Sequence, residues 1–220
     1  MSITENIGSI RKDIPHQVQL ICVSKYHSKE AILEAYNGGE RHFGESRAQE
    51  LIEKQASLPQ DIQWHFIGPL QTNKVKQIIP ITCLIHSVDS LKLLETIDTN
   101  AAKKGLKIAV LLEVHIADEE TKHGFSPNEI RSFFARKAWL NYPNIQLCGL
   151  MTIGSNHVSE SQTRNEFQLM AELFDEIKTL FAQPYFTELS MGMSQDYKLA
   201  IKAGSTMVRI GSSIFGERLS

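Results

Sequence analysis

The stretch that decides the fold is Val18-Gln19-Leu20-Ile21-Cys22-Val23, which is followed at once by Ser24-Lys25-Tyr26-His27-Ser28. Its first six residues are mostly apolar and rich in β-branched side chains, which predicts a buried strand. A lysine directly after such a strand lies at the rim of a core, where partial burial can lower the pKa of its amine and make it nucleophilic. The alternative is a surface lysine whose aliphatic stem lies along the core, so the role of Lys25 depends on the rest of the chain.

The alternation of strand and helix that begins here repeats along the chain. Apolar runs predict strands at about 18–23, 41–45, 62–67, 82–86, 106–114, 145–150, 185–189 and 206–209. Helical patterns lie before the first strand and after each one, at about 3–12, 29–36, 46–52, 74–78, 89–104, 127–137, 160–181 and 195–203, and again after Gly211. Strands that alternate with helices imply a parallel sheet.

Eight strand–helix units in 220 residues fit a compact, single-domain (β/α)₈ TIM barrel. An open doubly wound sheet is the alternative, but it would be unusually wide for so short a chain. No linker rich in Pro, Gly or Ser divides the sequence, so residues 1–220 are predicted to form one domain.

Two of the helices carry capping signals at their first residues. Ser46 and Gln49 have the spacing of a capping box. Ser126-Pro127-Asn128-Glu129 combines a capping box with proline at the first helical position, which is a strong start signal.

The composition excludes several classes of partner. The chain is 42% hydrophobic and 22% charged with a formal charge of -2, which gives no electrostatic footprint for nucleic acid or for a membrane surface. The N-terminus lacks the pattern of a signal peptide, and no apolar run is long enough to span a bilayer. Cys22, Cys83 and Cys148 are odd in number and lie in apolar strand-like segments. They are therefore predicted to be buried, reduced thiols of a cytoplasmic protein. No obvious exposed apolar stripe requires a partner, so a monomer is the default expectation.

The barrel prediction brings Lys25 together with the other end of the sequence. Active sites of such barrels lie at the C-terminal ends of the strands, and closure makes the eighth strand the neighbour of the first. Arg209 should therefore face the same mouth as Lys25, beside the loops that carry Gly192 and Gly211. Glycine-bounded turns that open onto helices supply backbone N–H groups, so this mouth is expected to bind an anion such as a phosphate.

The sequence resembles the pyridoxal 5′-phosphate homeostasis proteins over nearly its whole length, from about Val18 to Arg218. Each matching motif is short, but their order and spacing together are specific. They are Val23-Ser24-Lys25, Phe43-Gly44-Glu45, Gln49-Glu50, Trp64-His65-Phe66-Ile67-Gly68, Leu70-Gln71, Asn73-Lys74, His86-Ser87-Val88-Asp89, Gly149-Leu150-Met151, Leu189-Ser190-Met191-Gly192-Met193-Ser194, Asp196, Val208-Arg209-Ile210-Gly211 and Ile214-Phe215-Gly216.

This resemblance implies a barrel like the N-terminal domain of alanine racemase, with pyridoxal 5′-phosphate (PLP) held as a Schiff base on Lys25. Arg209 would face the pyridine nitrogen. The residues expected to hold the phosphate are Ser190, Met191, Gly192, Gly211 and Ser212. The implied role is intracellular vitamin B6 homeostasis, with PLP and PLP-dependent apoenzymes as partners.

The chain departs from the usual family pattern around the mouth. Ser46 stands where Asn is common, Glu113-Val114-His115 replaces Gln-Val-Asn, and Tyr26-His27-Ser28 replaces Thr-Lys-Pro. These changes are expected to alter the hydrogen bonds around the ligand, but they leave Lys25 and Arg209 in place.

The same residues argue against catalytic turnover. Arginine stays protonated, so opposite the ring nitrogen it disfavours the pyridinium form on which most PLP enzymes depend. No domain remains to supply a second acid or base, and the protein is therefore expected not to be an enzyme. Alternatives are a PLP-dependent amino-acid racemase or decarboxylase, a Schiff-base lyase or aldolase, and a metal-dependent hydrolase using His65, His86 and His115. The last lacks the short histidine spacings of a metal site, so no metal is expected, and these three histidines are instead expected to form hydrogen bonds at the rim of the barrel.

Overall fold

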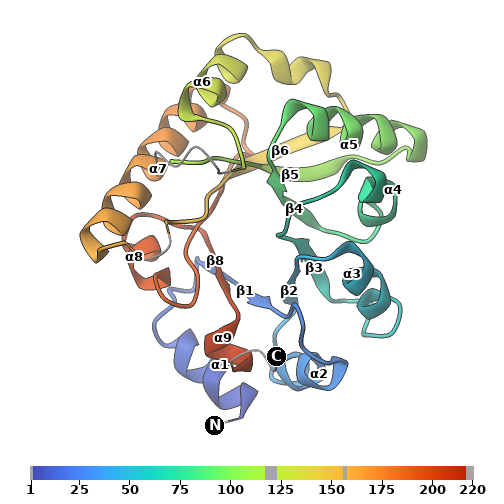
Figure 1. Ribbon diagram of the computed structural model, residues 1–220, viewed down its shortest axis with the longest axis vertical. Coiled ribbons are helices and arrows are strands. Elements are labelled where there is room, and N and C mark those ends of the chain that lie inside the picture. Colours follow the sequence, from blue (N-terminus) through green and yellow to red (C-terminus); the bar gives the residue numbers. More distant parts are fainter. Residues whose placement is uncertain (1, 117–122, 156–157, 217–220) are drawn as a thin grey trace.

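The computed structural model describes residues 2–116, 123–155 and 158–216, in which eight parallel strands close into a barrel (Figure 1). The strands are β1 (Gln19–Val23), β2 (His42–Glu45), β3 (Gln63–Phe66), β4 (Leu84–Val88), β5 (Ile108–Glu113), β6 (Ile145–Met151), β7 (Glu188–Ser190) and β8 (Met207–Ile210). They follow one another around the barrel in chain order, and β8 pairs with β1. The (β/α)₈ prediction is confirmed.

Helices surround this barrel on its outside (Figure 1). They are α1 (Ile3–Arg11), α2 (Lys29–Asn37), α3 (Ala48–Gln55), α4 (Val75–Ile78), α5 (Leu91–Lys104), α6 (Pro127–Ala135), α7 (Glu160–Phe181), α8 (Tyr197–Lys202) and α9 (Ser212–Phe215), with 3₁₀ turns η1 (Thr72–Lys74) and η2 (Ala138–Asn141). None of the helices in the described residues is long and apolar enough to cross a membrane.

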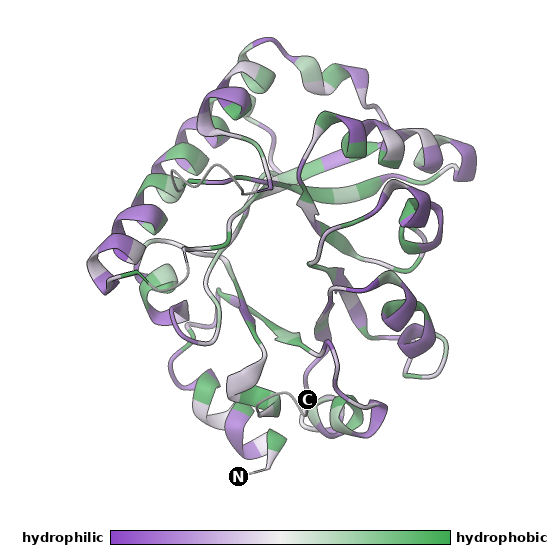
Figure 2. Ribbon diagram, in the orientation of Figure 1, coloured by the Kyte–Doolittle hydropathy of each residue, from purple (hydrophilic) through white to green (hydrophobic). Residues whose placement is uncertain are grey.

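Apolar side chains fill two layers. The larger layer lies between the barrel and the helices, which carry hydrophobic and hydrophilic residues on different faces (Figure 2). A smaller cluster comprises Leu84, Leu111, Cys148, Met151 and Met207, one or two residues from each of four strands. Because side chains alternate along a strand, and Leu20 and Cys22 belong to the larger layer, Ile21 and Val23 face the barrel interior.

One helix cap was predicted correctly and the other was not. The hydroxyl of Ser126 accepts from the backbone N–H of Glu129, and Pro127 opens α6, as expected. The capping box at Ser46 is wrong, because α3 begins one residue later with Arg47 as its uncapped N-terminal residue. Ser46 instead packs directly against Gly68, where an added Cβ would overlap its backbone.

Two strand-level expectations also need correction. Strand β7 begins at Glu188 and not at Tyr185, because residues before it form a turn closed by the Phe186 N–H and the carbonyl of Gln183. Cys22 and Cys148 are buried as predicted, but Cys83 lies before β4 and is exposed, so it is no core thiol. None of the three cysteines forms a disulfide bond.

Candidate functional site: the mouth of the barrel

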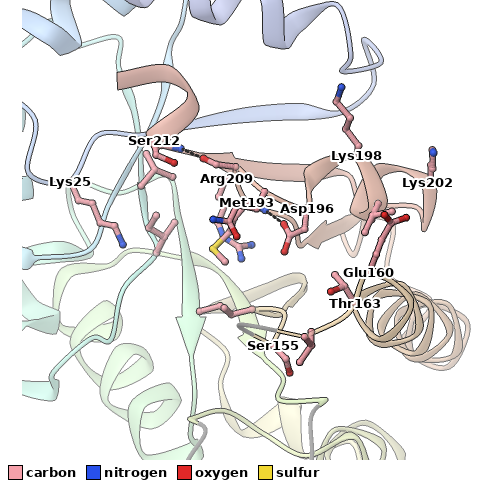
Figure 3. A pocket seen from close by; sticks show the side chains of 18 of the residues that line it. Lys25, Ser155, Glu160, Thr163, Met193, Asp196, Lys198, Lys202, Arg209 and Ser212 are labelled. Carbon is pink, nitrogen blue, oxygen red and sulfur yellow. Dashed lines mark hydrogen bonds between the residues drawn. The ribbon is translucent and has the colours of Figure 1, made fainter. Parts of the chain in front are cut away.

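A cavity of about 840 Å³ opens at the C-terminal ends of the strands. Both ends of the chain line it, with Lys25 after β1 and with Arg209, Gly211 and Ser212 on and after β8. In Figure 3 Lys25 lies on one side of the cavity and Asp196 on the other, with Arg209 between them. The structure therefore brings together four of the seven residues named from the sequence.

The other three named residues lie in the wall behind this surface. Ser190, Met191 and Gly192 are buried at the end of β7 and are not part of the cavity lining. The next residues of the same turn, Met193 and Ser194, line the cavity.

The backbone on both sides of Lys25 is held by the buried side chain of Lys54 and its partner. The Lys54 ammonium donates to the carbonyl oxygen of Ser24 at 2.8 Å and to Glu50 Oε1 at 2.6 Å. The same Glu50 oxygen accepts from the N–H of Tyr26 at 2.6 Å. Tyr26 has a φ of 68°, a conformation that costs a non-glycine residue energy and so needs such support.

Glu45 is the third charged side chain in the cluster around Lys54. Its side chain is fully buried, and Oε1 accepts from Lys54 at 2.8 Å and from the Ser24 hydroxyl at 2.5 Å. Burial raises the pKa of Glu45 to about 7, although the ammonium of Lys54 acts in the opposite direction. Sequence reasoning named Glu45 but missed Lys54, for which the only signal was its spacing of four residues from Glu50 on one helix face.

Arg209 is 5% exposed, and its guanidinium is fixed by two acceptors. Nη1 donates to the hydroxyl of Ser190 at 2.6 Å, and Nη2 donates to the carbonyl oxygen of Thr152 at 2.9 Å. Burial lowers the pKa of Arg209 to about 10, while Glu113 and Asp196 act to raise it, so the group is cationic at neutral pH. In this structure Ser190 thus anchors the arginine.

Backbone donors of the β8–α9 turn converge on one oxygen at the cavity surface. The N–H groups of Gly211 and Ser213 point at the hydroxyl of Ser194, at 3.2 and 3.4 Å. A Cβ on Gly211 would stand 3.2 Å from the carbonyl oxygen of Val23, so glycine permits the close approach of β8 to β1. Two amides that share one oxygen show how the turn presents donors to an anion. Ser194 lay in a recognised motif, but it was not among the residues chosen from it.

The histidines that suggested a metal site do not form one. His65 and His86 were expected at the rim of the barrel, but both are buried in its interior, 2% and 0% exposed. His115 lies after β5, where its Nδ1 is 2.9 Å from the carbonyl oxygen of Gly124. Within residues 2–116, 123–155 and 158–216, no three His, Cys, Asp or Glu side chains are grouped to hold a metal ion.

The chain is similar to known proteins over nearly its whole length. The family model described as "Alanine racemase, N-terminal domain" matches residues 1–219. The pyridoxal phosphate homeostasis protein of Schizosaccharomyces pombe is 42% identical over 211 residues, which cover 91% of this chain and 84% of that protein. PipY of Synechococcus elongatus PCC7942, solved with PLP bound, is 38% identical with a TM-score of 0.90, covering 98% of this chain and 100% of that chain.

A more distant likeness concerns the fold alone. Alanine racemase of Clostridium difficile 630 is 19% identical with a TM-score of 0.78, and the match covers 100% of this chain but 57% of the racemase chain. The barrel is therefore the part that the two proteins share. The family model and the relatives above 40% identity show that the chain belongs to the pyridoxal phosphate homeostasis proteins, within the alanine racemase N-terminal domain family.

Proposed function

We propose that this chain binds PLP at the mouth of the barrel as a Schiff base on Lys25, and that it holds and releases the cofactor without a reaction of its own. The observation that carries the proposal is the convergence of Lys25, Arg209 and Gly211 on one cavity, where the Gly211 and Ser213 amides point at the hydroxyl of Ser194 in its lining. PipY, which is 38% identical over nearly the whole chain, has been solved with PLP bound.

The donor set fits an aromatic aldehyde that carries a phosphate. The Lys25 amine would condense with the aldehyde and release one water molecule. The amides after β8, with Ser194 and Ser212 beside them, would hold the phosphate. Arg209 can donate to an unprotonated ring nitrogen, whereas a carboxylate in its place would favour the protonated ring.

One feature of the site supports storage over turnover. Arg209 is cationic and held by Ser190 and Thr152, so it weakens the electron-withdrawing power that PLP enzymes draw from a protonated ring.

The binding proposal is tested by trapping and mapping. The protein is mixed with PLP, reduced with borohydride, digested and searched by mass spectrometry for pyridoxyl-lysine. The label is expected on Lys25 in the wild-type chain, and Lys198→Ala, which removes an exposed lysine of the same cavity, should leave that label unchanged. A wild-type label confined to any other lysine would overturn the assignment.

The absence of turnover is tested separately. The loaded protein is incubated with each amino acid in deuterated water, and exchange of the α-proton is followed by NMR. We expect rates no higher than those of PLP alone. Rapid exchange or inversion would support the PLP-dependent racemase alternative.

Release to other proteins is tested with a PLP-dependent apoenzyme whose activity reports cofactor gain. Reactivation by the loaded chain is expected. If the apoenzyme recovers no activity while PLP alone restores it, storage without delivery is the better description.

A further inference from the structure

A line of hydrogen bonds crosses the interior of the barrel and ends at Arg209. His42 Nδ1 lies 3.0 Å from His65 Nε2, and His65 Nδ1 lies 2.9 Å from His86 Nε2. His86 Nδ1 lies 2.9 Å from Ser190 Oγ, which accepts from Arg209 Nη1 at 2.6 Å. We call these five residues the interior chain.

The interior chain joins the two faces of the barrel. His42 is the first residue of β2, half-buried at the N-terminal end of the strands, while Ser190 is the last residue of β7 at the mouth. Branched apolar side chains usually fill such an interior. Unsatisfied polar groups in this position would be costly, so a line of polar residues is tolerated only where each hydrogen bond is made.

The hydrogen bond from Arg209 selects one direction along the line. A guanidinium can only donate, so Ser190 Oγ accepts from Arg209. Among the described residues, His86 Nδ1 is the acceptor that the structure gives for the serine proton, and a second donor from His86 would leave that proton without one. With the serine donating to Nδ1, His86 carries its proton on Nε2 and donates to His65 Nδ1. By the same step His65 carries its proton on Nε2 and donates to His42 Nδ1. All donors therefore point away from the cation.

The electrostatic surroundings favour these neutral rings. Burial lowers the pKa of His65 to about 3 and that of His86 well below its ordinary value. Burial lowers the pKa of His42, with Glu40 acting to raise it and the cation of Arg11 acting to lower it. Around Arg209 the charged groups are Glu113 and Asp196. Neutral imidazoles with one donor and one acceptor nitrogen each are what a one-way line needs.

We propose that His42, His65 and His86 are positioning residues for the cofactor site: their one-way line turns the Ser190 hydroxyl away from the mouth and so fixes the arginine that faces the ring. The part of this inference that concerns the ring rests on the proposed function. The part that concerns Ser190 and Arg209 stands without cofactor.

The direction of the hydrogen bonds in the interior chain depends on the acceptor nitrogen of His42, Nδ1, at the end of the chain far from Arg209. Without an acceptor there, the His65 proton can move from Nε2 to Nδ1, and the His86 proton must then point at Ser190. Ser190 would receive two donors, from His86 and Arg209, and its own proton would turn elsewhere. The hydrogen bond that holds Arg209 would weaken.

The direction of the line is tested in the protein without cofactor. Long-range ¹H–¹⁵N NMR of histidine-labelled protein distinguishes Nε2–H, Nδ1–H and doubly protonated rings. We expect His65 and His86 to be neutral with Nε2–H throughout the range from about pH 6 to 8, in which an ordinary imidazole titrates. An Nδ1–H form of either ring, or its titration in this range, would overturn the proposal.

A matched pair of variants at His42 tests the coupling to the mouth. His42→Asn keeps an acceptor close to the position of Nδ1, and His42→Leu removes it. In the cofactor-free protein, exchange of the Arg209 guanidinium protons should match wild type for His42→Asn and be faster for His42→Leu. In the loaded protein, His42→Leu should release PLP about five- to tenfold faster, the loss expected for one weakened charge-assisted hydrogen bond.

The readouts separate this proposal from the proposed function. If the wild-type chain fails to bind PLP, the proposed function fails while the tautomer and arginine-exchange measurements still decide the interior chain. If both variants fold but behave alike at Arg209, or if PLP release from His42→Leu equals that of His42→Asn, the proposed coupling is wrong. Thermal denaturation of both variants serves to exclude a general loss of structure.

Discussion

The positions of Lys25 and Arg209 at the mouth of the barrel could be predicted from the sequence, whereas the contacts that hold these two residues could not. Lys25 lies just after a strand, at the end of the barrel where such sites are found, and barrel closure brings Arg209 to the same mouth, so both positions follow from local pattern and topology. Lys54 and Ser190 act through contacts between distant elements. Ser190 was named from its motif as a phosphate residue, but its contact with Arg209, like the contact of Lys54 with Ser24, follows from packing and not from sequence pattern.

Removing the ammonium of Lys54 should lower both the stability of the protein and its binding of PLP, and two measurements distinguish these effects. Lys54→Met leaves Glu45 buried without its cation, and we expect a loss of about 3 kcal/mol in the free energy of unfolding. Below its melting temperature the variant should also trap less PLP on Lys25, because the Ser24 and Tyr26 backbone is no longer held. Urea denaturation and borohydride trapping measure the two effects. The exposed Lys76→Met serves as control, and unchanged trapping in a folded Lys54→Met would contradict the positional role.

Replacing the arginine tests what it does to the ring. Arg209→Glu should change the visible spectrum of the loaded protein and weaken PLP binding, because a carboxylate favours a protonated ring nitrogen and repels the phosphate. Arg209→Lys keeps a cation that can donate to Ser190 and should bind PLP more tightly than Arg209→Glu. Equal affinity and identical spectra for wild type and Arg209→Glu would show that the side chain makes no contact with the ring.

Elements were predictable where a periodic pattern was long, and less so where backbones approach closely. The 22 residues of α7 match the predicted range, since its apolar stripe has no competing interpretation. The start of β7 and the cap of α3 were wrong because a turn at Gln183–Phe186 and the packing of Ser46 on Gly68 are tertiary features. A close backbone contact requires a small residue, such as glycine or serine, but the sequence does not show which residue lies against it.

Gly149 in β6 makes such a contact. An added Cβ there would overlap the carbonyl oxygen of Glu188 in β7, a strand of three residues with little pairing to spare. Gly149→Ala should therefore lower the free energy of unfolding by about 3 kcal/mol or more. The matched change Gly8→Ala, in α1 where nothing lies within 4 Å, should raise it by about 0.5–1 kcal/mol. Chemical denaturation of both variants checks the contrast, and equal effects would refute it.

The molecule as a whole combines a predictable architecture with an interior that the sequence did not predict. Eight repeats defined the barrel because each unit carries its own turn and helix signals. The histidines were expected at the rim because their positions near strand ends were read without the register, and the register turns His65 and His86 inward.

Two buried neutral rings contribute a pH dependence to the free energy of unfolding. Both imidazoles have folded-state pKa values below the ordinary 6.5, so the unfolded chain takes up protons that the folded chain refuses. Their contribution is complete above about pH 6.5 and falls as the pH drops from there toward 3, by about 1.4 kcal/mol per pH unit for each ring. Burial raises the pKa of Glu45 and of Glu113 to about 7, so these carboxyls act in the opposite direction between pH 7 and 5, and the contribution of a ring is measured as a difference between variants. Urea denaturation between pH 7 and 5 should show that His65→Leu gains about 1.4 kcal/mol relative to wild type for each pH unit of acidification. The exposed His16→Gln serves as control, and equal slopes for wild type and His65→Leu would contradict the assignment.

The pairing of β8 with β1 has a consequence for the order in which a cell makes this site. Lys25 leaves the ribosome long before Arg209, so the lysine is synthesised before its counterpart exists. Until β8 docks beside β1, the amine has neither the arginine nor the Gly211 turn next to it. If Lys25 binds the cofactor as proposed, capture has to wait until β8 has been made and has docked: a nascent or prematurely terminated product that lacks β8 carries the lysine but not the pocket.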